Sequence, residues 1–84
     1  MINEIKLRIN YPYAVIFKEY SWTQDEHIDD YMEEAYLIYT AIIEGKTKII
    51  SWIMGMGTSC TVLEPKELIE DVIKEHKKVL NNYK

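Results

Sequence analysis

The sequence predicts an α+β domain of the ferredoxin-like (βαββαβ) type, with an antiparallel sheet and an additional C-terminal helix. Three observations lead to this prediction. Residues 4–10 alternate apolar and polar side chains, as a strand with one buried face does. Residues 35–43, AYLIYTAII, form an apolar run of high strand propensity that only Thr40 interrupts. Residues 65–83 place apolar side chains at helical spacing, which is typical of an amphipathic helix.

Two further elements are expected before the apolar run. Pro12 ends the first strand, and residues 13–20 then fit either a strand, by their β-branched content, or a short helix that Pro12 opens. We favour the helix. Residues 26–33 are ambiguous alone, but the long strand that follows favours a hairpin partner, turning near Glu33 and Glu34 without the usual Gly or Asn.

The second half of the chain has clear boundary residues. Glu44 and Gly45 end the long strand, and a helix over 46–56 is expected to run until Gly57, which can adopt the left-handed conformation that ends helices. Residues 59–63 are expected to form the fourth strand, and Pro65 to open the last helix. The apolar stripe of that helix consists of Leu68, Ile69, Val72, Ile73, His76, Val79, Leu80 and Tyr83, where His76 is expected to pack.

The apolar run 35–43 predicts a sheet that is buried on both faces. Alternation places Tyr36, Ile38 and Ile42 opposite the core-facing side chains, so something must cover them. The last helix of the same chain or a second copy of the chain could do so. The side chains expected at a self-association interface are therefore Tyr36, Ile38, Ile42, Val79, Leu80 and Tyr83.

Composition narrows the possible classes of protein. The 84 residues are expected to form a single domain over 1–84, and the net charge of −4 argues against binding a phosphate backbone. The lone Cys60 excludes an internal disulfide and favours a reducing compartment. No run approaches the roughly 20 apolar residues of a membrane span. We therefore expect a cytoplasmic protein that makes no contact with a membrane.

No constellation of catalytic or metal-binding residues is evident, so neither an enzyme nor a cofactor is expected. Cys60 lacks a neighbouring base and fits a small core residue. Arg8, on the outward face of the first strand, is best explained as an ordinary exposed residue. The alternative is a site for a small anion or nucleotide, which Arg8, Lys6, Tyr13 and Lys18 would form at the edge of the domain.

The segment SWIMGMGTSCTVLEPKEL, residues 51–68, resembles the WCX domain, the C-terminal extension of WYL-domain transcriptional regulators. The resemblance lies in Trp52, in the glycines around Met56 and in the Val-Leu-Glu-Pro stretch that opens the last helix. It continues upstream through EIKLRI and YPYAVIFKEYSW, and so spans nearly the whole chain. This sequence departs from the family pattern at Met56, where an aromatic residue is frequent, and at Glu33 and Glu34, where a glycine turn is often found.

This resemblance implies that the chain is part of a longer bacterial regulator. Such proteins carry an N-terminal winged helix-turn-helix that binds DNA and a WYL domain that senses a ligand, often thought to be nucleic acid or a nucleotide. The implied partners are the WYL domain of the same protein and a second copy in a homodimer, with DNA reached only through the helix-turn-helix. The family's WCX domain is associated with dimerisation and with modulating the response of the WYL domain.

Overall fold

The computed structural model describes residues 2–20, 22–23 and 25–84, and these form a four-stranded antiparallel sheet with three α-helices. The strands are β1 (Ile2–Asn10), β2 (Glu26–Tyr31), β3 (Tyr36–Glu44) and β4 (Cys60–Glu64). The helices are α1 (Tyr13–Lys18), α2 (Lys46–Gly55) and α3 (Lys66–Asn81). The predicted α+β class, the antiparallel sheet and the C-terminal helix are therefore confirmed. The ambiguous segment after Pro12 is a helix.

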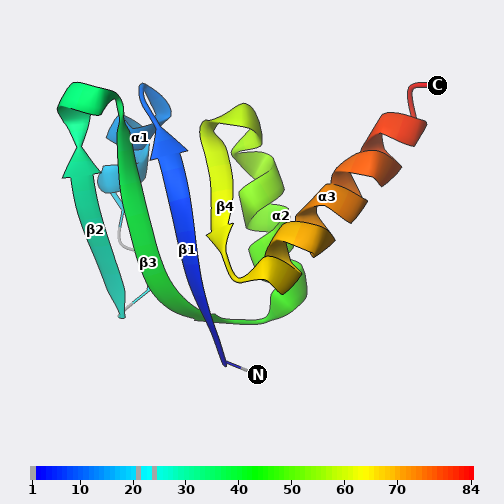
Figure 1. Ribbon diagram of the computed structural model, residues 1–84, viewed down its shortest axis with the longest axis horizontal. Coiled ribbons are helices and arrows are strands. Elements are labelled where there is room, and N and C mark those ends of the chain that lie inside the picture. The colour runs from blue at the N-terminus through cyan, green and yellow to red at the C-terminus, as the bar shows by residue number, and fades with distance from the viewer. Residues whose placement is uncertain (1, 21, 24) are drawn as a thin grey trace.

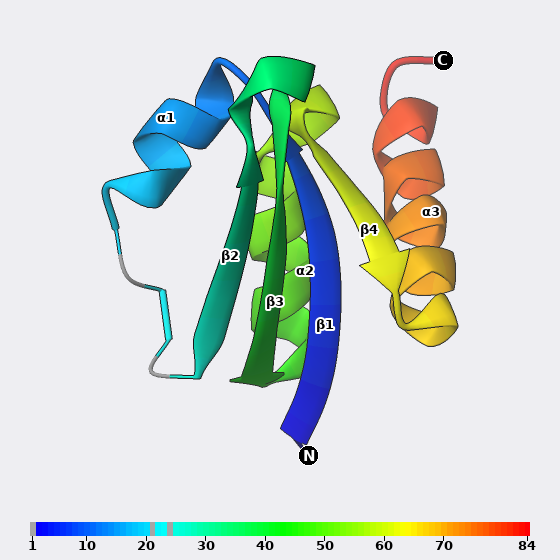
Figure 2. The same cartoon turned by 60° about the vertical axis from the view of Figure 1, so that its left-hand side comes forward.

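The sheet has the strand order β2-β3-β1-β4, so the first and third strands are central. The β1–β3 ladder runs the full length of both strands, from Ile2 opposite Glu44 to Asn10 opposite Tyr36. β4 is shorter, and its pairing with β1 shifts register between Lys6 and Leu7. α1 and α2 lie on the same side of the sheet, behind it in Figure 1; Figure 2 shows α2 behind the strands and α1 to the left of β2.

The core lies between this side of the sheet and the helices. Its sheet residues are Ile5, Leu7 and Ile9 of β1 and Leu37, Tyr39 and Ala41 of β3, and its helix residues are Ala14, Phe17, Ile49, Ile53, Met56, Leu68 and Val72. The phenyl ring of Phe17 contacts Trp22, Trp52 and Tyr39 at centroid distances of 5.4, 5.9 and 4.9 Å. Trp52, which carries much of the resemblance in residues 51–68, therefore belongs to this aromatic cluster.

Two turns differ in detail from the expected ones. The hairpin between β2 and β3 turns through a 3-10 turn, Met32–Glu34, and Ala35, which has φ 68° instead of extending β3. A non-glycine residue in this conformation bears a steric cost, so the left-handed position of this turn is held by a residue that is uncommon there. Gly57 has φ +57°, so the left-handed glycine after α2 is confirmed, two residues beyond the helix end.

α3 does not cover the open face of the sheet, and the expectation that it could do so is wrong. It lies beside β4 and α2, with its C-terminal end pointing away from the sheet (Figure 1). Only Leu68 and Val72 are buried on this helix, and His76 is exposed instead of packed. β4 has only five residues and ends next to the first turn of α3. Because the helix points away from the sheet after this turn, only its first half packs against β4 and α2.

Candidate functional site

The first candidate surface is the open face of the sheet, opposite α1 and α2. Arg8, Tyr36 and Ile38 lie together on the two central strands, near the end of the β1–β3 ladder where Arg8 pairs with Ile38 and Asn10 with Tyr36. The Arg8 guanidinium lies over the Tyr36 ring at 4.1 Å, a cation–π contact, while its Nε donates to Asn10 Oδ1 at 3.2 Å. Tyr31 stacks on the other side of this group, with its ring 5.2 Å from that of Tyr36.

The electrostatics of this open face are mixed. Lys6 and Glu64 form an ion pair at 3.4 Å, and His27 lies 3.0 Å from Asp29. Desolvation raises the pKa of the Tyr36 hydroxyl, and its hydrogen bond with Glu34 raises it further. Arg8, a positive charge held against an aromatic ring, is therefore a candidate to contact a partner that brings a carboxylate or an apolar surface to this face.

The second candidate surface is the C-terminal half of α3. Ile73, Val79, Leu80 and Tyr83 are 49%, 43%, 56% and 83% exposed. Ile73, Val79 and Leu80 lie on α3 and Tyr83 lies in the turn directly after it, and together they leave an apolar surface that no described element covers. Uncovered apolar surface of this kind is typical of an interaction site.

The six residues expected at an interface fall on these two surfaces. Tyr36 and Ile38 are half-buried on the open face, and Ile42, 42% exposed, extends this group along β3. Val79, Leu80 and Tyr83 belong to the exposed end of α3. β1 and β4 separate the two groups in the sheet order, so they form two patches.

The four residues expected around an anion site do not come together. Lys6 and Arg8 alternate with the buried residues of β1 and so point to the open face. Tyr13 and Lys18 lie on α1, behind the sheet. The Lys18 ammonium is 2.6 Å from Asp30 Oδ2, and Tyr11 donates to Asp30 Oδ1 at 2.7 Å.

These contacts shift the titration of the Lys18–Asp30 pair. The hydrogen bond from Lys18 lowers the pKa of the Asp30 carboxyl, and the bond from Tyr11 lowers it further. The same bond to Asp30 raises the pKa of the Lys18 ammonium, and the contact with Tyr11 adds to this. Lys18 therefore already has a carboxylate partner, in a link that fastens α1 to the edge strand β2.

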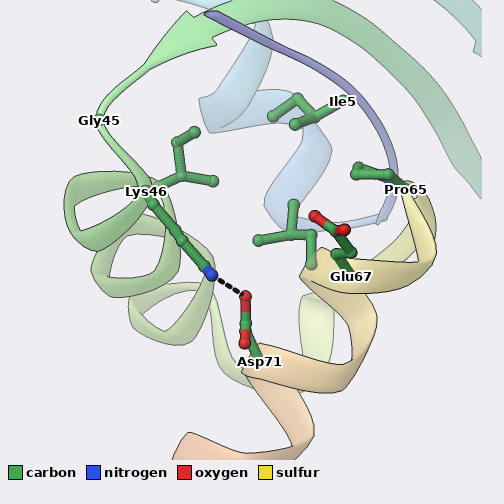
Figure 3. Close-up of a pocket in the computed structure, with 8 residues that line it drawn as sticks. Ile5, Gly45, Lys46, Pro65, Glu67 and Asp71 are labelled. Atoms are coloured by element: carbon green, nitrogen blue, oxygen red, sulfur yellow. Dashed lines mark ion pairs between the residues drawn. The ribbon is translucent and has the colours of Figure 1, made fainter. Parts of the chain in front are cut away.

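Figure 3 shows a cleft that the sequence did not indicate, with a volume of about 270 Å³. Ile5, Ile49 and Leu68 provide its apolar wall, and Lys46 reaches Asp71 across its mouth at 2.8 Å. This contact with Asp71 is the main cause that raises the pKa of Lys46. The cleft joins the first turns of α2 and α3 to β1, three segments that are far apart in the chain, so no local pattern could reveal it.

The Cys60 thiol is half-buried on β4. Burial raises the pKa of the Cys60 thiol to about 12, which keeps it a poor nucleophile near neutral pH. Across the described residues, His, Cys, Asp and Glu form no group of three or more that could hold a metal ion. Within the same part of the chain, no helix combines the length and the apolar character needed to cross a membrane.

Comparison with known proteins identifies one family. The model of the WCX domain matches residues 3–80, which is nearly the whole chain, from β1 to the last turn of α3. Comparison with curated proteins gives no match. The family match covers the open face of the sheet, the second surface as far as Leu80, and the 51–68 segment. The chain therefore belongs to the WCX domain family.

Proposed function

We propose that this WCX domain is the C-terminal regulatory and dimerisation domain of a bacterial helix-turn-helix regulator of the WYL type. In this proposal the domain has no catalytic activity and works in the cytoplasm. It modulates the effector response and the DNA binding of the full protein through contacts with the WYL domain and with a second copy. The family supports the regulatory context, since WCX domains accompany WYL regulators.

One observation supports the self-association: in the second half of α3 the apolar side chains Ile73, Val79 and Leu80 are exposed, and no described element covers them. A single amphipathic helix is stabilised in water mainly by the surface against which its apolar side packs. α3 has such a surface only as far as Val72. The exposed side chains beyond that point gain free energy when a second protein surface removes them from water.

Sedimentation equilibrium of the chain from low to high micromolar concentration tests this self-association. We expect a reversible monomer–dimer equilibrium that Leu80→Ser shifts strongly toward monomer. Ile16→Ser is the matched control, because Ile16 is 52% exposed on α1, close to the 56% of Leu80. A monomer at every concentration, or equal effects of the two substitutions, would contradict the proposed role of α3.

The alternative function is a sensor module for a small anion or a nucleotide. Arg8 is the one observation that favours it, because its guanidinium lies on an open face and its contacts there are with Tyr36 and Asn10. The separation of Lys6 and Arg8 from Tyr13 and Lys18 weakens the four-residue site. A thermal-shift screen with nucleotides and short single strands tests it, where stabilisation that Arg8→Ala abolishes would favour the sensor.

We further propose that the fold is a ferredoxin-like split βαβ unit. The strand order β2-β3-β1-β4 supports this assignment, as do the two helices on one side of the sheet. In such a unit the open face and the C-terminal extension are both available to partners. This agrees with the positions of the two candidate surfaces.

A further inference from the structure

We propose that α3 pairs antiparallel with α3 of a second copy of this chain, along a seam formed by Ile69, Ile73, His76, Leu80 and Tyr83. These five residues are called the α3 seam below. The inference rests on the proposed self-association and deepens it, because it names the contact surface and the relative orientation of the two copies.

The spacing of the α3 seam is that of a helix pair. Its members follow one another at intervals of four, three, four and three residues, the pattern of the a and d positions of a heptad; the first four lie within α3, and Tyr83 lies in the turn directly after it. The seam is rotated by about 80° around the helix from Leu68 and Val72, which pack on the domain's own core. The two faces adjoin but serve different contacts, and the seam remains free for a partner while α3 stays packed on its own domain.

The exposure of the seam increases toward the C-terminus. Ile69 is half-buried, Ile73 is 49% exposed and Tyr83 is 83% exposed. Figure 1 and Figure 2 both show the later turns of α3 standing clear of the sheet. A second helix can therefore lie against the seam without displacing any described element of the domain.

The distribution of charge along α3 favours an antiparallel orientation and a second copy of this chain as the partner. The charge changes sign along α3, since residues 66–73 carry one lysine and three carboxylates, a net −2, and residues 74–81 carry three lysines and one carboxylate, a net +2. Two parallel copies would place like charges side by side along the whole contact, whereas antiparallel copies place each acidic half against a basic half. The two helix dipoles also oppose each other in the antiparallel pair. The surface is thus self-complementary, as a contact related by a two-fold axis requires.

The heptad spacing also determines how the two α3 helices align along the contact. In an antiparallel pair with Ile73 of one copy beside His76 of the other, Ile69 faces Leu80 at both ends of the contact. Glu70 of each copy flanks the seam next to Lys77 of the other copy, so two equivalent ion pairs form across the axis. His76 is the only strongly polar member of the seam, and a single polar residue in such a core favours one register at a cost in affinity.

Disulfide trapping tests the orientation. In a Cys60→Ser background, single-cysteine variants Ile69→Cys and Leu80→Cys are prepared, one of them isotopically labelled, then mixed and oxidised. Antiparallel pairing predicts that the mixed disulfide between positions 69 and 80 forms in excess over its statistical proportion. A predominance of symmetrical 69–69 and 80–80 disulfides would show a parallel pair and overturn the orientation.

Charge reversal tests the same pairing without new cysteines. Glu70→Lys and Lys77→Glu should each raise the dimer dissociation constant by roughly tenfold, and the double variant should restore it, because the two ion pairs re-form with exchanged signs. Lys48→Glu, on the exposed side of α2, is the control for net charge.

The outcomes separate this pairing from the proposed function. A dimer that persists unchanged in both single reversals and forms no 69–80 disulfide keeps the self-association and overturns the α3 seam. A wild-type chain that stays monomeric throughout overturns both.

Discussion

The Tyr39 hydroxyl offers the sharpest test of how the core is held together. Tyr39 is fully buried in β3, and its hydroxyl donates to Glu26 Oε2 at 2.8 Å. The same oxygen accepts the backbone N–H groups of Trp22 and Thr23 at 3.0 and 3.2 Å. Tyr39 therefore links the core to the carboxylate that holds the connection between α1 and β2.

Tyr39→Phe removes this hydroxyl and keeps the ring that contacts Phe17. A hydrogen bond to a charged acceptor contributes about 1.5–3 kcal/mol, and the lower end applies because Glu26 keeps its other donors. A loss of about 1.5 kcal/mol lowers the melting temperature of a domain of this size by roughly 6–12 °C. Thermal and urea unfolding followed by circular dichroism measure the change, with Tyr20→Phe, an exposed tyrosine, as the control.

The pH dependence gives an independent check. Desolvation, and then the bond to Glu26, raise the pKa of Tyr39 in the folded chain above its usual value of 10.0. The unfolded chain therefore releases this proton first as the pH rises past 10, and the wild type loses stability there that Tyr39→Phe cannot lose. The stability gap between the two proteins should narrow above pH 10. A gap that is absent at neutral pH, or that widens in alkali, would refute the reasoning.

Four further substitutions or measurements follow from local geometry. The lowered pKa of Asp30 contributes stability above its usual value of 3.8 that is lost in acid, so Asp30→Asn should flatten the fall of the urea midpoint from pH 5 to 2. Gly57→Ala places a side chain on a residue with φ +57° and should destabilise the fold by about 1–2 kcal/mol. Gly55→Ala, at the end of α2 with open space around its Cβ, should stabilise the fold by about 0.5 kcal/mol. Chemical denaturation measures the change in the free energy of unfolding in both variants. The native Cys60 thiol should react slowly with iodoacetamide at pH 8 and rapidly in urea, because burial raises its pKa to about 12.

The sequence predicted the parts of the fold that depend on local pattern. The alternation in β1 and the apolar run of β3 identify two strands of the sheet, because both are long and each buries three successive side chains on one face. The left-handed glycine at position 57 followed from the steric freedom of that residue. These are properties of short segments, and a single sequence carries them.

Contacts between segments that are far apart in the chain could not be predicted from local sequence patterns. The apolar periodicity of α3 shows which side of the helix favours burial, but not how much of its length another element reaches. The cleft bridged by Lys46 and Asp71 could not be predicted for the same reason, since it is formed by three segments that are far apart in the chain. The anion site failed to assemble because strand alternation and a helix behind the sheet place Arg8 and Lys18 on opposite sides.

Both tryptophans of the protein lie in one place, and this determines what a fluorescence experiment can detect. Trp22 and Trp52 are 5.5 Å apart, in the cluster around Phe17, so the emission of the protein reports the packing of α1, α2 and β3. No tryptophan lies on α3, whose later turns can fray while the emission stays constant. Helical ellipticity that falls before the fluorescence changes would therefore signal fraying of this helix, and not a folding intermediate of the domain.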